Sequence, residues 1–427
     1  MVCAGAAWGP TVFVPGRSGG WPGWMAGPLA GLVPALTPGS FEAYTLLMCV
    51  GYGLVLVSAR ALSARTLAGA IVAANMILLL GPPLISQDVF GYLSFARMGV
   101  LHGLDPYTHV AAQAPTDPIF PFIGWPGQHS PYGPLFTLAS YATAPLGLAG
   151  GLWTLKAAAV AGSLAATGLT ARAAALMGGS ARGAAAFVGL NPVMLELAVG
   201  GAHNDTLVLA FLAGSLVLTA GASPRFRAGA VTLAAGVGIK LTAGITLPFL
   251  VLAPRDWRGW AQTCLAALAG LALMAAIGLV GFGSHALGFL DAVGEQQQLV
   301  ASHSVPAETA RLFGLSGTPS WWRHCYVAGF VVVVLYALWR TARGADWRVA
   351  AGWSTLALLV STAWLLPWYA IWPLPLAAVR GDRRLRGATL VFCAYAVLIH
   401  LALADPLLKP PKVHVVPHHA HIATLGR

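Results

Sequence analysis

The stretch "TLAGAIVAANMILLLGPPLISQDVFGYL", residues 66–93, joins an apolar run to a single carboxylate, Asp88. The run at 66–84 is long enough to cross about 30 Å of hydrocarbon as a helix. Asp88 follows a few residues later, in a chain that has few charges to place. The stretch therefore predicts a transmembrane helix whose end brings an acid to the membrane surface.

Similar apolar runs recur throughout the 427 residues, of which 57% are hydrophobic and 9% charged, with a mean hydropathy of +0.74. A soluble fold of this length would lack the polar side chains to cover its surface. We predict an all-α polytopic membrane protein in which residues 41–404 form one bundle of about 9–13 transmembrane or half-length helices. Full-length runs are expected at 41–59, 66–84, 153–171, 183–202, 205–220, 259–282, 324–341, 348–365 and 387–404.

Three shorter apolar pieces lie between these runs, at 134–149, 228–252 and 369–379, and the second is interrupted by Lys240. We expect half-length or re-entrant helices here, which occur at membrane depth only when buried in protein or lining a cavity. The Gly- and Pro-rich segment 1–40 is expected to be interfacial or disordered. The tail 405–427 is expected to be disordered.

The basic residues predict the orientation of the bundle, because they fall in short loops that can all lie in the cytoplasm. Two polar loops, about 85–133 and 283–322, are then extracytoplasmic. The net charge of +11 does not indicate nucleic-acid binding, since the arginines are scattered in pairs rather than gathered on one face. Contact with anionic lipid explains them better. Five cysteines without CxxC spacing support neither a disulfide framework nor a zinc site.

The first outer loop carries the first group of candidate site residues. Asp88 and Arg97 could form an ion pair, with Asp88 acting only as a helix cap, or both could face a ligand. The turns "GLDPYT" (103–108) and "QHSPYGPL" (128–135) supply further polar and aromatic side chains. A loop of this length is usually functional or disordered, and its aromatic residues favour order. The candidates in the turns are Asp105, Tyr107, His129 and Tyr132.

Polar side chains inside the apolar part of the chain supply the rest, because an ionisable group in a membrane segment marks a function or a tight partner. The motif "GGAHNDTL" (200–207) holds His203, Asn204 and Asp205, of which one could be a helix N-cap. Lys240 needs an anion, either Glu196 or Asp205 or a ligand phosphate. In "STAWLLPWYAIWPLP" (361–375), Trp368 and Tyr369 could form an aromatic belt or, because prolines break the helix there, line a cavity.

Five motifs in one order resemble the actinobacterial polyprenyl-phosphomannose-dependent α-1,6-mannopyranosyltransferases, which are GT-C membrane glycosyltransferases. They are "SQDVFGYLSFARMGVLHGLDPYT", "HSPYGPL", "GGAHNDTLVLAF", "GIKLTAGITLPF" and "LLPWYAIWPLP". The resemblance implies transfer of mannose from a polyprenyl phosphate to a lipid-linked mannan outside the plasma membrane, with Asp88 at the position of the catalytic carboxylate. The sequence departs from the family pattern before residue 40, where relatives carry another membrane helix, and it is short at the C-terminus.

These expectations combine into a single inverting displacement in which Asp88 takes the proton of the acceptor hydroxyl. Lys240 and Arg97 would bind the donor phosphate. Sugar or acceptor contacts, or support of the acid, would come from His129, Tyr132, His203, Asn204, Asp205, Asp105, Tyr107, Trp368 and Tyr369. Asp205 could instead be a second acid or a metal ligand, although no cofactor is required and the sequence does not support a divalent cation.

Two alternatives remain open. The first is a GT-C transferase that uses another polyprenyl-phosphate sugar or a protein acceptor, because the residues alone do not distinguish mannose from other sugars. The second is a polyprenyl-lipid flippase or transporter, since broken helices and charges at membrane depth also line translocation paths. The large outer loop argues against a transporter.

Overall fold

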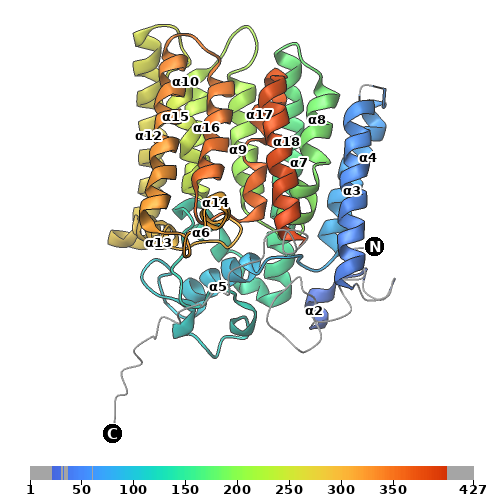
Figure 1. Ribbon diagram of the computed structural model, residues 1–427. Coiled ribbons are helices and arrows are strands. Elements are labelled where there is room, and N and C mark those ends of the chain that lie inside the picture. Colours follow the sequence, from blue (N-terminus) through green and yellow to red (C-terminus); the bar gives the residue numbers. More distant parts are fainter. Residues whose placement is uncertain (1–21, 30–31, 33–36, 60, 402–427) are drawn as a thin grey trace.

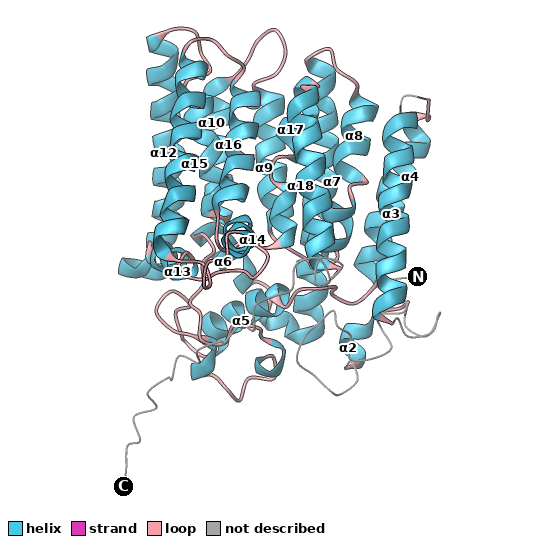
Figure 2. Cartoon of the chain, viewed as in Figure 1, coloured by secondary structure: helices cyan, strands magenta, loops and turns pink. Residues whose placement is uncertain are grey.

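The computed structural model describes residues 22–29, 32, 37–59 and 61–401, which form helices and loops without a β-strand (Figure 2). The predicted all-α fold is therefore confirmed. Long helices stand side by side as a bundle, and the short helices α2, α5, α13 and α14 gather at one end of it (Figure 1). Most of the predicted segment 1–40, and the whole of the predicted tail 405–427, lie outside the described residues.

The helices that build the bundle differ in length. Within the described residues, four segments are long and apolar enough to cross a membrane: Gly39–Ser58, Pro134–Leu176, Trp257–His285 and Ser320–Ala342. A fifth is added if one bent pair is counted as a span. The bundle helices are α3 (Pro38–Ser58), α4 (Ala64–Leu80), α7 (Gly147–Leu176), α8 (Ala181–Gly189), α9 (Asp205–Leu218), α10 (Phe226–Ile239), α12 (Trp257–Phe282), α15 (Ser320–Ala342), α16 (Trp347–Ser361), α17 (Leu374–Arg380) and α18 (Arg383–His400).

Short helical elements complete the chain. They are α2 (Gly23–Ala26), α5 (Asp88–Leu101), η2 (Ala111–Gln113), η3 (Phe120–Phe122), α6 (Pro134–Tyr141), η4 (Ala144–Leu146), η5 (Val193–Val199), η6 (Leu241–Thr246), α11 (Leu247–Val251), η7 (Gly283–His285), α13 (Gly288–Gln296), α14 (Val305–Leu312) and η8 (Pro367–Ile371). All η elements are 3-10 helices except η5, which is a π-helix. Such π-segments are often found at functional sites.

The predicted helix 183–202 is broken, which corrects the expectation of one continuous span. Helix α8 ends at Gly189, and η5 follows after Pro192 with its axis bent by 45°. Pro192 lacks the N–H that a continuing helix would use. The side chain of Asn191 instead accepts a hydrogen bond from the backbone N–H of Val193 at 2.9 Å.

The three predicted half-length segments do form short elements. Residues 226–251 divide at Lys240, whose backbone is extended (φ −152°, ψ 129°), into α10, η6 and α11. Residues 134–146 form α6 and η4, while 367–380 form η8 and α17.

The first outer loop is ordered because it shares an apolar core with the bundle helices. Helix α5 buries Phe90, Tyr92 and Leu93 completely or nearly so, against aromatic rings that include Phe122 and Phe136. Burying each such side chain contributes about 1.5–3 kcal/mol relative to leaving it in water. The loop therefore packs against the bundle as a fixed layer.

The two polar loops lie at the same end of the bundle (Figure 1). His285 of the second loop contacts Asp105 of the first at 3.1 Å, and Glu295 contacts His129 at 3.3 Å. Loops rich in arginine come together elsewhere, around a surface hollow bordered by Arg255, Arg343, Arg348 and Arg380. The two polar loops and the arginine-rich loops, which the sequence predicted to lie on opposite sides of the membrane, are thus grouped separately in space.

Candidate functional site

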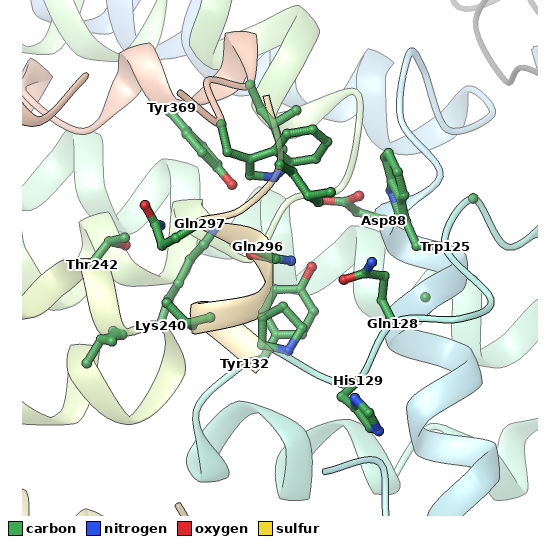
Figure 3. A pocket seen from close by; sticks show the side chains of 18 of the residues that line it. Asp88, Trp125, Gln128, His129, Tyr132, Lys240, Thr242, Gln296, Gln297 and Tyr369 are labelled. Carbon is green, nitrogen blue, oxygen red and sulfur yellow. The ribbon is translucent and has the colours of Figure 1, made fainter. Parts of the chain in front are cut away.

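A cavity of about 250 Å³ lies where the two polar loops meet the broken helices. Its volume is near the lower limit of about 300–1,000 Å³ for ligand sites. Asp88, Trp125 and Gln128 border it on one side, and Lys240, Thr242 and Gln297 border it on the other (Figure 3). Tyr132 and Gln296 lie between the two sides in this view. The cavity therefore places a carboxylate and an ammonium group on one enclosed space.

Asp88 is the first residue of α5, and its side chain is 13% exposed. The backbone before it is anchored to the segment that carries His203, because the N–H of Leu84 donates to the carbonyl of Gly200 at 2.9 Å. Gly91 and Phe95 of the same helix also line the cavity. Since residues three to four apart share one face of an α-helix, that face of α5 turns toward the cavity.

Arg97 does not pair with Asp88, so the ion pair that the sequence left open as one alternative does not form. Its Nε donates to both oxygens of Asp117, at 2.9 and 3.1 Å, and His102 Nε2 lies 2.6 Å from the same carboxylate. Burial alone would raise the pKa of Asp117, but hydrogen bonds from Arg97, His102 and the N–H of Ile119 hold the pKa below its ordinary value. Arg97 is not among the cavity residues, so the structure does not support it as a phosphate ligand.

Lys240 has the internal partner that the sequence offered as one option, Asp205. Its Nζ lies 2.9 Å from both carboxylate oxygens, and the indole N–H of Trp372 donates to Asp205 Oδ1 at 2.7 Å. The ammonium also lies 4.8 Å from the centroid of the Tyr369 ring, a cation–π contact. Asp205 is fully buried, whereas the Lys240 side chain is 13% exposed and borders the cavity. Lys240 therefore meets a protein anion on one side and the cavity on the other.

The position of Lys240 is fixed by a close approach of two chain segments. The N–H of Gly133 donates to the carbonyl of Ile239 at 2.9 Å. A Cβ atom on Gly133 would lie 2.3 Å from the carbonyl oxygen of Gly238, so only glycine fits. The end of α10 is thus joined directly to the loop that carries Tyr132.

Four of the predicted sugar contacts do not border the cavity. His203, Asn204, Asp205 and Trp368 are buried and do not line it. Asn204 faces the hydroxyl of Tyr92 at 3.4 Å, and His203 stacks on Trp368. These side chains do not border the cavity in this structure, so their contact with sugar hydroxyls, or their support of the acid, stays a prediction.

Asp105 and Tyr107 also lie outside the cavity and have structural contacts instead. Asp105 accepts a hydrogen bond from the N–H of Tyr107 at 2.9 Å and contacts His285. The Tyr107 hydroxyl donates to the carbonyl of Tyr132 at 2.8 Å, and its ring packs on Phe282. Through these contacts the two residues hold the loops together, and their contact with a ligand stays a prediction.

His129, Tyr132 and Tyr369 do line the cavity, as the sequence predicted for residues that contact a ligand. Burial raises the pKa of the Tyr132 hydroxyl well above its ordinary value, and the nearby phenol of Tyr92 and carboxylate of Asp88 act in the same direction. Tyr132 therefore keeps its proton and can donate a hydrogen bond. His129 Nδ1 contacts Glu295 of α13 at 3.3 Å.

Several cavity residues were not predicted from the sequence. The run "EQQQ" at 295–298 is unusual in so apolar a chain and could have drawn attention to Gln296 and Gln297. Trp125 and Trp364 form an edge-to-face pair with centroids 5.5 Å apart, and no local pattern links these distant positions. The missed residues include Trp125, Gln128, Thr242, Gln296 and Gln297.

Among the described residues, no group of three or more His, Cys, Asp or Glu side chains could hold a metal ion. Asp205, which the sequence offered as a metal ligand, is already bound by Lys240 and Trp372. Its place in the site is that of a buried counter-ion.

Comparison with known proteins gives consistent matches over most of the chain. Residues 13–256 match the N-terminal domain of the α-(1→6)-mannopyranosyltransferase family, and residues 318–425 match the MptB C-terminal domain. The α-(1→6)-mannopyranosyltransferase A of Mycobacterium tuberculosis is 29% identical over 380 residues, which cover 80% of this chain and 72% of that protein. The enzyme of the same name from Corynebacterium glutamicum is 34% identical over 179 residues, 41% of this chain and 36% of its own. No solved structure matches.

Proposed function

Because the chain belongs to the α-(1→6)-mannopyranosyltransferase family and is thus an α-1,6-mannosyltransferase, we propose that its donor is polyprenyl phosphomannose and its acceptor a lipid-linked mannan or a similar glycan. The observation that carries this proposal is the cavity that holds Asp88 and Lys240 on facing sides (Figure 3). A sugar phosphate needs a cation for its phosphate, and an attacking hydroxyl needs a base. The cavity offers one of each.

Lys240 is the proposed ligand of the donor phosphate. It is the one lysine or arginine among the cavity residues that the structure describes. A hydrogen bond between an ammonium and a phosphate oxygen is charge-assisted, and it strengthens where water is excluded. Asp205 and the rings of Tyr369 and Trp372 hold the ammonium in place before the donor arrives.

Asp88 is the proposed general base. The acceptor hydroxyl gives its proton to the Asp88 carboxylate while its oxygen forms a bond to the anomeric carbon. The bond from that carbon to the phosphate oxygen breaks, and the phosphate leaves with the electron pair. Phosphate needs no proton to leave, so one carboxylate suffices where inverting glycoside hydrolases use two. A displacement with inversion gives an α-mannoside only if the donor is β-linked.

The two sides of the cavity suggest where each substrate lies. The acceptor must touch Asp88, and Trp125 and Gln128 border the cavity on that side (Figure 3). The donor must touch Lys240, beside Thr242 and Gln297. Amide and hydroxyl groups suit sugar hydroxyls, and an indole face suits the apolar face of a sugar ring. We therefore assign Trp125 and Gln128 to the acceptor and Thr242 and Gln297 to the donor sugar.

The proposed side of the membrane follows from charge. Arginine-rich loops belong on the cytoplasmic side by the positive-inside rule. The cavity instead lies beside the two polar loops, which are not rich in arginine. The reaction is therefore proposed to take place on the extracytoplasmic face of the plasma membrane. A polyprenyl donor keeps its tail in the bilayer and presents its head group at that interface.

Replacement of Asp88 tests the proposed chemistry. Asp88→Asn should reduce transfer of radiolabelled mannose from polyprenyl phosphomannose by about 10²- to 10⁴-fold, because a positioned base contributes a factor of that order. Expression and thermal stability should stay close to wild type. Near-normal turnover by well-folded Asp88→Asn would contradict the assignment. Movement of intact donor across the membrane without product would indicate a flippase instead.

A further inference from the structure

His203 is completely buried beside Asp88, and hydrogen bonds within the core do not account for its polar ring nitrogens. Its Nδ1 lies 3.3 Å from Asp88 Oδ2, with the side chain 0% exposed. Neither ring nitrogen makes an aligned hydrogen bond with any of the described residues. Buried polar groups in proteins are nearly always hydrogen-bonded, so one that is not points to a role in function. The contact with Asp88 is close enough to become a hydrogen bond after a small rotation of the Asp88 carboxylate.

The ring of His203 is held so that Nδ1 keeps facing Asp88. One face stacks on Trp368, with centroids 3.9 Å apart and planes inclined by 20°. The far edge rests on Gly201, where an added Cβ atom would lie 2.6 Å from His203 Nε2. Because the ring is clamped between an indole and a backbone that has no side chain, it cannot turn away without moving its neighbours.

The two segments that carry the pair are also joined and strained. Ile85 and Ala202 are the only non-glycine residues with positive φ in the described part of the chain, at 71° and 56°. Positive φ is unfavourable for a β-branched residue such as isoleucine, and such strain collects at functional sites. The hydrogen bond from Leu84 to Gly200 ties these strained segments together. Backbone strain therefore lies in the two segments that bring Asp88 and His203 into contact.

We infer that His203 is a positioning residue for the general base, an inference that rests on the proposed function. When the acceptor hydroxyl engages one oxygen of Asp88, the Nδ1–H of His203 donates to the other oxygen. That hydrogen bond fixes the rotation of the carboxylate, so that its free oxygen points at the proton to be removed. Catalytic hydrogen bonds are often long in unliganded enzymes and tighten when substrate binds. His203 itself touches no substrate, since it does not line the cavity.

Paired substitutions separate this role from packing. Asparagine places an amide N–H near the position of Nδ1, whereas glutamine places it near Nε2. We expect His203→Gln to lower kcat by about 10- to 100-fold with little change in donor or acceptor KM. His203→Asn should retain most of the activity. The matched control is His285→Gln, which removes another contact between a histidine Nδ1 and an aspartate, Asp105, at residues that do not line the cavity, and it should leave kcat unchanged.

A double-mutant cycle completes the test, using full-length protein in membranes with polyprenyl phosphomannose and a synthetic α-1,6-dimannoside. In the Asp88→Asn background, His203→Gln should cause no further loss, because there is no longer a base to position. An equal loss in both backgrounds, or equal activity of the Asn and Gln variants, would overturn the positioning role. Wild-type protein that is inactive with this donor would overturn the proposed function, and this inference with it.

Discussion

Lys240 has a counter-ion before any substrate binds, so replacing it should affect the stability of the protein as well as its activity. Asp205 is fully buried and receives both the ammonium and the indole N–H of Trp372. Removing one partner of a buried ion pair costs about 3–5 kcal/mol, because the remaining charge loses its compensation. A loss of activity in Lys240→Met alone would therefore mix donor binding with destabilisation.

A double replacement separates the two effects. Lys240→Met should lower both thermal stability and affinity for the donor. Adding Asp205→Asn removes the orphaned charge and leaves an amide oxygen that can accept from Trp372, so stability should recover in part. Donor affinity, measured as the dissociation constant of a non-transferable polyprenyl phosphosugar analogue, should stay at least about 10-fold weaker, since a charge-assisted hydrogen bond is worth about 1.5–3 kcal/mol. Recovery of affinity together with stability would contradict the phosphate role.

The sequence predicted the pairing of Lys240 with Asp205 as one option, but it did not predict the contacts of Asp88. The reason is geometric. Lys240 needed an anion, and few carboxylates lie in the apolar part of the chain, so Asp205 was one of two candidates. Asp88 and Arg97 are nine positions apart on one helix. Nine steps of 100° end on the opposite face of an α-helix, so one side chain faces the cavity and the other faces Asp117. The contact between His203 and Asp88 joins segments more than a hundred residues apart and cannot be read from spacing.

Interrupted helices place the reactive groups at the scale of secondary structure. Helix α10 ends immediately before Lys240, α5 begins at Asp88, and η8 carries Tyr369. The sequence indicated the breaks at Lys240 and near Pro367 because a charge and several prolines interrupt apolar runs there. It did not indicate the π-helix η5, since an apolar segment looks the same whether its backbone is α or π. The sequence also did not predict that the end of α13 lines the cavity, because Gln296 and Gln297 give no periodic signal.

Substitutions on the two sides of the cavity should affect different substrates. Trp125→Ala and Gln128→Ala should raise the acceptor KM by about 10-fold or more, because an aromatic contact or hydrogen bond is worth on the order of 1 kcal/mol or above. Thr242→Ala and Gln297→Ala should instead raise the donor KM. Initial rates measured with each substrate varied at saturating amounts of the other would show this. Equal changes in both constants for all four variants would contradict the division of the cavity.

At the scale of the whole molecule, the arrangement of charge agrees with the arrangement of loops. The sequence predicted that the two polar loops share one face, and the contacts between Asp105 and His285 and between His129 and Glu295 join them. Such a prediction succeeds because it depends on counts of basic residues in loops and not on side-chain geometry. The cavity itself could not be predicted, because its walls come from α5, the end of α10, α13 and the segment around η8, whose packing is a property of the assembled bundle.

The same charge arrangement predicts on which side of the membrane transfer takes place. Sealed right-side-out vesicles should transfer mannose to a water-soluble α-1,6-dimannoside added outside, and permeabilising them should raise the rate little. Inside-out vesicles should be nearly inactive until they are permeabilised, because the acceptor cannot cross the bilayer to reach Asp88. Latency of a cytoplasmic marker enzyme would verify the seal in each preparation. The reverse pattern would place the cavity on the cytoplasmic face of the membrane. It would also require the arginine-rich loops to lie outside, against the positive-inside rule.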